Sequence, residues 1–172
     1  FLGAVENFFS KCAPAMFMGW SNLNFDRRMF HFNFFKGNRY PYITHSSPNS
    51  EHDGLHIARA AQTINPETLK TELTDAGNES LALEGLSRMQ GFDTSASHTA
   101  YVDALNALQI LRIVRDKHKK NWDTFLKTST KAGVDTLLNK EGIFSMQRVR
   151  DVYPPTFTLQ RFNFFVLIFA SK

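Results

Sequence analysis

Side-chain oxygens at alternate positions are the first feature of this sequence that could do chemistry. They lie within residues 92–108, at the first, third and fifth positions of a twelve-residue stretch: Asp93, Ser95 and Ser97. This is the spacing of the oxygen ligands in a loop that wraps a calcium ion. His98 stands where such a loop has glycine, however, and Ala104 stands where it has a glutamate that binds the ion through both oxygens.

The same spacing recurs at a constant interval along the chain. The sixth loop position falls at residues 54, 98 and 142. Oxygen-bearing side chains also occupy the ligand positions of the outer two stretches: Asn49, Glu51 and Asp53 in the first, Asn139 and Glu141 in the third. Self-similarity at a fixed period is typical of repeated supersecondary units.

Residues 49–153 therefore resemble the EF-hand array of the calmodulin family, and the resemblance implies helix–loop–helix units. The twelfth position departs from the family, because it holds Ala60, Ala104 and Arg148. A loop with one carboxylate and no bidentate glutamate does not offset the dehydration of calcium, so we expect the framework without its ion. Only the first loop, with Glu51 and Asp53, is a candidate for weak calcium binding. A helical domain that matches this spacing by chance is the alternative.

Two further patterns bear on metal and phosphate chemistry. His52 and His56 are four residues apart, as in a zinc protease helix, but Gly54 favours a loop and no third ligand follows at a recognisable spacing. We therefore expect no metal site and no cofactor. The sequence has no phosphate-binding glycine loop, dinucleotide fingerprint or nucleophile elbow. The single cysteine, Cys12, excludes an intrachain disulfide.

Aromatic and basic residues are interleaved between Arg27 and Arg39. Alternation of phenylalanine with polar residues over 30–34 predicts a half-buried strand. Single-stranded nucleic acid also binds such mixtures of rings and cations, but we favour an interface with protein partners, and lipid headgroups second. A second Phe-rich segment closes the chain and is too short to span a bilayer as a helix. The predicted partner contacts are Phe30, Phe32, Phe34, Phe35, Phe162, Phe164, Phe165 and Phe169.

The elements that position these residues are mostly helical by periodicity. Apolar spacing and capping residues predict helices over 1–12, from 55 onward, over 65–77, 79–90 and 100–117, around Trp122, and after Ser145. In the helix over 100–117, Leu105 and Leu108 are expected in the core. Asp93 and Ser97 are expected to act as turn or cap groups.

The sequence as a whole predicts a mainly α, EF-hand-like domain with aromatic-rich, partly extended ends. We divide it into an aromatic and basic extension (1–48), the helical domain (49–153) and a Phe-rich tail (154–172). The net charge of +4, the single cysteine and the start at Phe1 favour a non-catalytic accessory subunit of an organellar complex at a mitochondrial membrane. Nucleic acid is not expected as a partner. The alternatives are a calcium sensor acting through the first loop, and an RNA-contacting subunit of a ribonucleoprotein.

Overall fold

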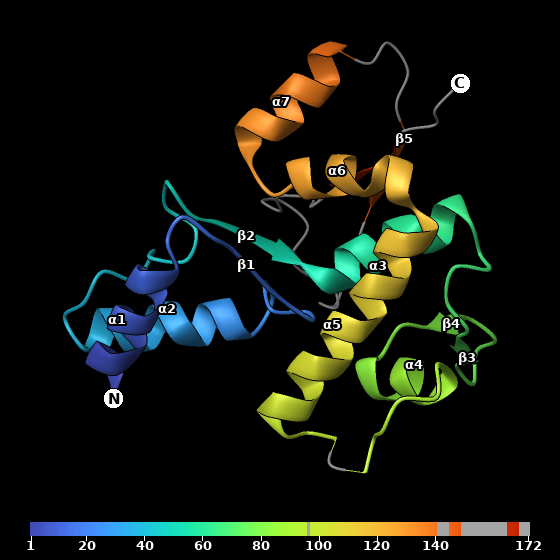
Figure 1. The fold of residues 1–172 in the computed structure, drawn as a ribbon, viewed down its shortest axis with the longest axis horizontal. Coiled ribbons are helices and arrows are strands. Elements are labelled where there is room, and N and C mark those ends of the chain that lie inside the picture. Colours follow the sequence, from blue (N-terminus) through green and yellow to red (C-terminus); the bar gives the residue numbers. More distant parts are fainter. Residues whose placement is uncertain (96, 141–144, 149–164, 169–172) are drawn as a thin grey trace, which may run out of the picture.

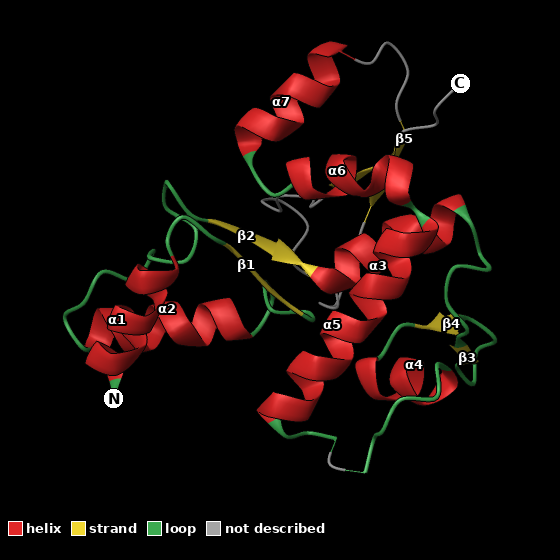
Figure 2. Ribbon diagram, viewed as in Figure 1, coloured by secondary structure: helices red, strands yellow, loops and turns green. Residues whose placement is uncertain are grey.

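The computed structural model describes residues 1–95, 97–140, 145–148 and 165–168. Its helices are α1 (Leu2–Cys12), α2 (Asp26–Lys36), α3 (Gly54–Ile64), α4 (Leu83–Met89), α5 (Ala100–Lys117), α6 (Lys119–Lys127) and α7 (Lys131–Lys140). Its strands are β1 (Met16–Gly19), β2 (Ser50–Asp53), β3 (Glu72–Leu73), β4 (Glu79–Ser80), β5 (Ser145–Arg148) and β6 (Phe165–Ile168). Figure 2 shows the helices around the short strand pair β1–β2.

A parallel pair of strands organises the first third of the chain. β1 and β2 are hydrogen-bonded in parallel, with Met16 opposite Ser50 and Gly19 opposite Asp53. Parallel neighbours need a crossover connection, and α2 lies within it, so β1, α2 and β2 form a βαβ unit. The unit joins segments on both sides of residue 48, where the sequence analysis places a domain boundary. The division into three segments stays a prediction.

The core lies where α3 crosses α5. Alanines of α3 let the two helices approach closely, and the apolar face of α5 packs on them together with side chains of α4 and α6. The buried cluster consists of Ile57, Ala58, Ala60, Ala61, Leu69, Leu86, Ile110, Leu111, Val114 and Phe125. In Figure 1, α5 runs through the middle of the molecule, α1 and α2 lie together on one side of it, and α4 lies on the other.

The predicted strand over 30–34 is wrong, because these residues belong to α2. Phe30 and Phe34 are one helical turn apart, and their rings stack with centroids 4.1 Å apart. Phe9 of α1 packs edge-on against Phe30 at 5.3 Å, and Phe34 is only 1% exposed. Phenylalanines occupy several sides of the helix, so their alternation in the sequence imitates a strand.

Of the other local predictions, two helices are confirmed, while one helix, one helix cap and two core positions are wrong. Helices 1–12 and 100–117 are confirmed as α1 and α5. The predicted helix over 65–77 is wrong, since this segment holds turns and the short strand β3. Ser145 begins the strand β5 and caps no helix. Leu105 and Leu108 are 38% and 45% exposed, so the prediction that they are core residues is wrong.

The EF-hand-like, mainly α fold class is also wrong, and the first loop shows why. Asp53 is fully buried and accepts hydrogen bonds from the backbone N–H groups of Ser21 (2.8 Å) and Leu55 (3.0 Å). Glu51 accepts from the Thr44 hydroxyl and pairs with Arg27 at 3.6 Å. The oxygens that calcium would need are therefore already used within the βαβ unit.

Candidate functional site

A large groove separates the α1–α2 pair from α5. Its volume is about 1260 Å³, and most of its wall is apolar. We call it the α2–α5 groove. Its apolar lining includes Phe1, Phe9, Phe17, Trp20, Phe30, Leu108 and Leu111, and its polar lining includes Asn22, Asp26, Arg27, Glu51, His98 and Asp103. Mostly apolar grooves with a few convergent polar groups are typical of binding and active sites.

Asp26 reaches the groove from the first turn of α2. A carboxylate is stabilised there by the partial positive charge of the helix N-terminus. The turn that precedes α2 is fixed by Asp53, which binds the backbone N–H groups of Ser21 and Leu23. Ser21 has the positive φ of 57° that this turn requires. The buried Asp53 thereby sets the position from which Asp26 enters the groove.

Asp103 reaches the groove from the first turn of α5. Its Oδ1 accepts a hydrogen bond from the backbone N–H of His98 at 3.3 Å, which holds the loop before α5 against the helix. His98 has a positive φ of 70°, and its exposed ring lies 3.4 Å from Glu84, measured from Nε2 to Oε2. Asp26 and Asp103 thus line the same groove as the imidazole of His98.

The donor set of the groove suits a hard divalent cation. Among the residues that the structure describes, no three His, Cys, Asp or Glu side chains cluster tightly enough to enclose a metal ion. Mg²⁺ is commonly held by one or two carboxylates, with water and substrate phosphate as its remaining ligands. Asp26 and Asp103 are carboxylates on the wall of the groove, and the described residues form no zinc-type cage.

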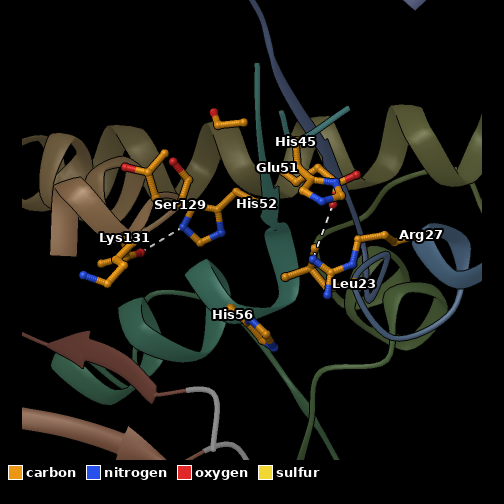
Figure 3. A pocket seen from close by; sticks show the side chains of 11 residues that line it. Leu23, Arg27, His45, Glu51, His52, His56, Ser129 and Lys131 are labelled. Carbon is orange, nitrogen blue, oxygen red and sulfur yellow. Dashed lines mark hydrogen bonds and ion pairs between the residues drawn. The ribbon is translucent and has the colours of Figure 1, made fainter. Parts of the chain in front are cut away.

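A second, smaller hollow adjoins the groove. It measures about 340 Å³ and lies where β2 and the start of α3 meet the α6–α7 junction (Figure 3). We call it the histidine hollow. It is lined by Leu23, Arg27, His45, Ser50, Glu51, His52, His56, Thr128, Ser129, Thr130 and Lys131. Arg27 and Glu51 line both the hollow and the groove.

His52 ties the two sides of the hollow together. Its Nδ1 accepts from the backbone N–H of Asp53 at 2.8 Å, which leaves a proton on Nε2 to donate to the Phe125 carbonyl at 2.8 Å. Nε2 also lies 3.0 Å from the Thr128 hydroxyl. Burial lowers the pKa of His52, although the Phe125 carbonyl works in the opposite direction. The ring is therefore a neutral structural link between β2 and the end of α6.

The predicted partner-contact residues fall into three groups. Phe30 and Phe34 pack inside the α1–α2 pair, while Phe32 and Phe35 are 61% and 78% exposed on α2. Phe165 begins β6. Phe162, Phe164 and Phe169 lie outside the described residues. Partner contact through these phenylalanines stays a prediction.

Comparison with known proteins identifies the fold. No protein-family profile matches the chain. The chain is similar to exodeoxyribonuclease I of Haemophilus influenzae, with 24% identity over 123 residues, which cover 71% of this chain and 26% of that protein.

Solved structures agree with this similarity. Exonuclease I of Methylocaldum szegediense matches with a TM-score of 0.73 and 21% identity, over 88% of this chain and 32% of that one. Exonuclease I of Escherichia coli in complex with a dA16 oligonucleotide matches with a TM-score of 0.72 and 23% identity, over 78% of this chain and 29% of that one. The chain therefore has the α/β nuclease fold of exonuclease I, of which it spans less than a third of the length.

These findings overturn four further predictions. The similar proteins are nuclease-fold proteins and not EF-hand arrays, and they are named as enzymes, against the predicted non-catalytic subunit. One solved relative contains an oligonucleotide, against the expectation that nucleic acid is no partner. The relatives are bacterial, against a mitochondrial or other organellar location. Among the described residues, no helix is both long and apolar enough to cross a membrane.

Sequence analysis missed Asp26, His98 and Asp103 as site residues. Both His98 and Asp103 lie in the stretch compared with a calcium loop. That comparison gave Asp103 no role and placed His98 at the position of the loop glycine. Their spacing across a helix start, with an acidic residue in the first turn of α5, was the available signal. Asp26 had no local signal, because its partner Asp103 is distant in sequence and only the fold brings the two to one groove.

Proposed function

We propose that the chain is part of a deoxyribonuclease of the exonuclease I type, and that the α2–α5 groove holds a single DNA strand for hydrolysis. The observation that carries this proposal is the meeting of Asp26, His98 and Asp103 in one groove of a nuclease fold. Similar proteins are named exodeoxyribonuclease I, and a solved relative contains a DNA oligonucleotide.

Asp26 and Asp103 would hold a divalent cation beside the reacting phosphate. When bound, such a cation lowers the pKa of a water molecule and stabilises the charge that develops on the phosphate oxygens. Asp26 and Asp103 would supply its oxygen ligands from the first turns of the two helices that flank the groove. The hydrogen bond from the His98 backbone to Asp103 keeps one carboxylate oxygen oriented.

His98 is the group in this groove that can move a proton. Its exposed imidazole can accept the proton of the attacking water or donate one to the leaving oxygen. Oε2 of Glu84 lies 3.4 Å from its Nε2. The apolar wall, which includes Phe1, Phe9 and Leu108, offers faces on which bases can stack or pack.

Digestion of a labelled single-stranded oligodeoxythymidylate by the full protein, with Mg²⁺ or Mn²⁺ present, tests this function. Asp103→Asn and Asp26→Asn keep the side-chain shape and remove the charge. Each should slow digestion by about 10²-fold or more, the size of effect seen when one electrostatic contact to a transition state is lost. Chelation of the divalent cation should stop digestion altogether.

Asp123→Asn is the matched control, because Asp123 is an exposed carboxylate on α6 outside the groove. Its digestion rate should equal that of the unaltered protein. Equal rates for Asp103→Asn and Asp123→Asn would show that the groove carboxylates take no part in hydrolysis, and the proposed function would then fail.

A further inference from the structure

The histidine hollow has the wall of an anion site. Besides three histidines it presents the cations Arg27 and Lys131 and the hydroxyl groups of Ser50, Thr128, Ser129 and Thr130. Figure 3 shows Arg27 and Lys131 on different sides of the hollow, with His52 between them. Cations and hydroxyl donors converging on one space are what phosphate oxygens require.

Negative charge in this wall is small and already compensated. Glu51 is the carboxylate among the lining residues, and only 7% of its side chain is exposed. It pairs with Arg27 at 3.6 Å and accepts from the Thr44 hydroxyl. Lys131 pairs with Asp135 on the same exposed helix face, at 2.7 Å. A solvent-exposed pair of this kind is weak enough for the Lys131 side chain to exchange partners.

One ring nitrogen of the hollow, and one on His31 outside its wall, lack a hydrogen-bond partner within the described part of the chain. Nδ1 of His45 is buried and has no partner. Nε2 of His31 is likewise buried without a partner, and the two ring centroids lie 5.1 Å apart. Burial lowers the pKa of His31, and the neighbouring His45 lowers it further. Buried polar groups are normally hydrogen-bonded, so the unpartnered Nδ1 of His45 points to a ligand in the hollow.

The position of the hollow suggests which ligand. Arg27 follows Asp26 directly in α2 and lines both spaces, so the hollow opens beside the reacting end of the α2–α5 groove. A DNA strand presents a phosphate at every nucleotide. A strand with one phosphate at Asp26 and Asp103 brings a neighbouring phosphate toward Arg27.

We propose that the histidine hollow binds a phosphate group through Arg27, Lys131, Ser129 and His45. Phosphate binding itself is independent of the function proposed above, whereas the assignment of a DNA strand as its source rests on that function. A free phosphate or a mononucleotide presents the same oxygens. The two sources differ in whether a strand reaches the hollow.

Histidine ring NMR signals of the full protein, in chloride buffer free of other oxyanions, provide the measurement. Inorganic phosphate, thymidine 5′-monophosphate and a single-stranded oligodeoxythymidylate are the three probes. Each probe that binds should shift the signals of His45 and His52 in a saturable manner. Lys131→Met should weaken phosphate binding by about 10-fold or more, the loss of one charge-assisted hydrogen bond. His45→Phe keeps the ring packing and should weaken it as well.

Lys127→Met is the matched control, since Lys127 ends α6 four residues earlier and does not line the hollow. If phosphate leaves the His45 and His52 signals unchanged, or if both lysine variants bind equally well, the proposal is overturned. Displacement of phosphate by the oligonucleotide assigns the site to a strand, and displacement by the mononucleotide alone assigns it to a free phosphate ester. Asp26→Asn should lose digestion yet keep phosphate binding, which separates this site from the proposed function.

Discussion

Removal of the Asp53 carboxylate should destabilise the protein more than loss of any exposed acidic residue. Asp53 is fully buried at the end of β2. Its Oδ1 accepts hydrogen bonds from the backbone N–H groups of Ser21 at 2.8 Å and Leu55 at 3.0 Å. Its Oδ2 accepts a longer one, 3.4 Å, from the backbone N–H of Leu23. The same carboxylate caps α3 and shapes the turn that leads to Asp26.

The size of the effect follows from these contacts. A hydrogen bond to a charged group contributes about 1.5–3 kcal/mol, so the two short bonds predict a loss of about 3–6 kcal/mol for Asp53→Ala. Burial lowers the pKa of Arg59, and the negative charge of Asp53 acts in the opposite direction. Removal of that charge leaves the Arg59 cation less stable and adds to the loss. Asp53→Asn keeps the oxygen that accepts from Ser21 and Leu55, and should cost about 1–3 kcal/mol.

Urea unfolding followed by far-UV circular dichroism measures these free energies of unfolding. The free energy of unfolding should be lowest for Asp53→Ala, intermediate for Asp53→Asn and highest for the unaltered protein. Asp123→Ala, an exposed control on α6, should lie within about 0.5 kcal/mol of the unaltered protein. A loss below about 1 kcal/mol for Asp53→Ala would refute the assignment of this carboxylate as the organiser of the βαβ unit.

Two further predictions concern the core and pH. Leu86→Ala should cost about 2–5 kcal/mol in urea unfolding because Leu86 is fully buried, whereas Leu105→Ala, at 38% exposure, should cost clearly less; equal losses would contradict the packing of α5. Stability should also fall as pH drops from neutral to below 6.5, the ordinary pKa of histidine. Burial lowers the pKa of His52 and His56, so the unfolded chain binds more protons in that range. Urea midpoints that stay constant between neutral and mildly acidic pH would contradict this.

The sequence predicted helices well where one period dominated. α5 was predicted with its observed bounds, because apolar residues recur along it at helical spacing. Its buried face was placed wrongly at Leu105 and Leu108, which are exposed while Ala107 and Ile110 are buried. Leu108 lines the α2–α5 groove, so its apolar character belongs to a surface that the local pattern cannot distinguish from the core.

Long-range contacts explain what could not be predicted. The oxygens of Asn49, Glu51 and Asp53 looked like ligands, yet the Asn49 oxygen accepts from the backbone of Ala15 and an Asp53 oxygen accepts from that of Ser21. Each of these partners lies in another segment of the chain. The candidate site has the same origin, because separate helix starts supply its two carboxylates and only the fold brings them to one groove.

The most direct test of the groove site compares the single variants Asp26→Asn and Asp103→Asn with the double variant in digestion of single-stranded DNA. Residues that act as one unit show strongly non-additive losses. If both carboxylates hold one reacting phosphate, each single variant should lose about 10²-fold or more in rate, and the double variant should lose little beyond the worse single one. Losses that multiply in the double variant, or a single variant with unchanged rate, would contradict a joint role for Asp26 and Asp103.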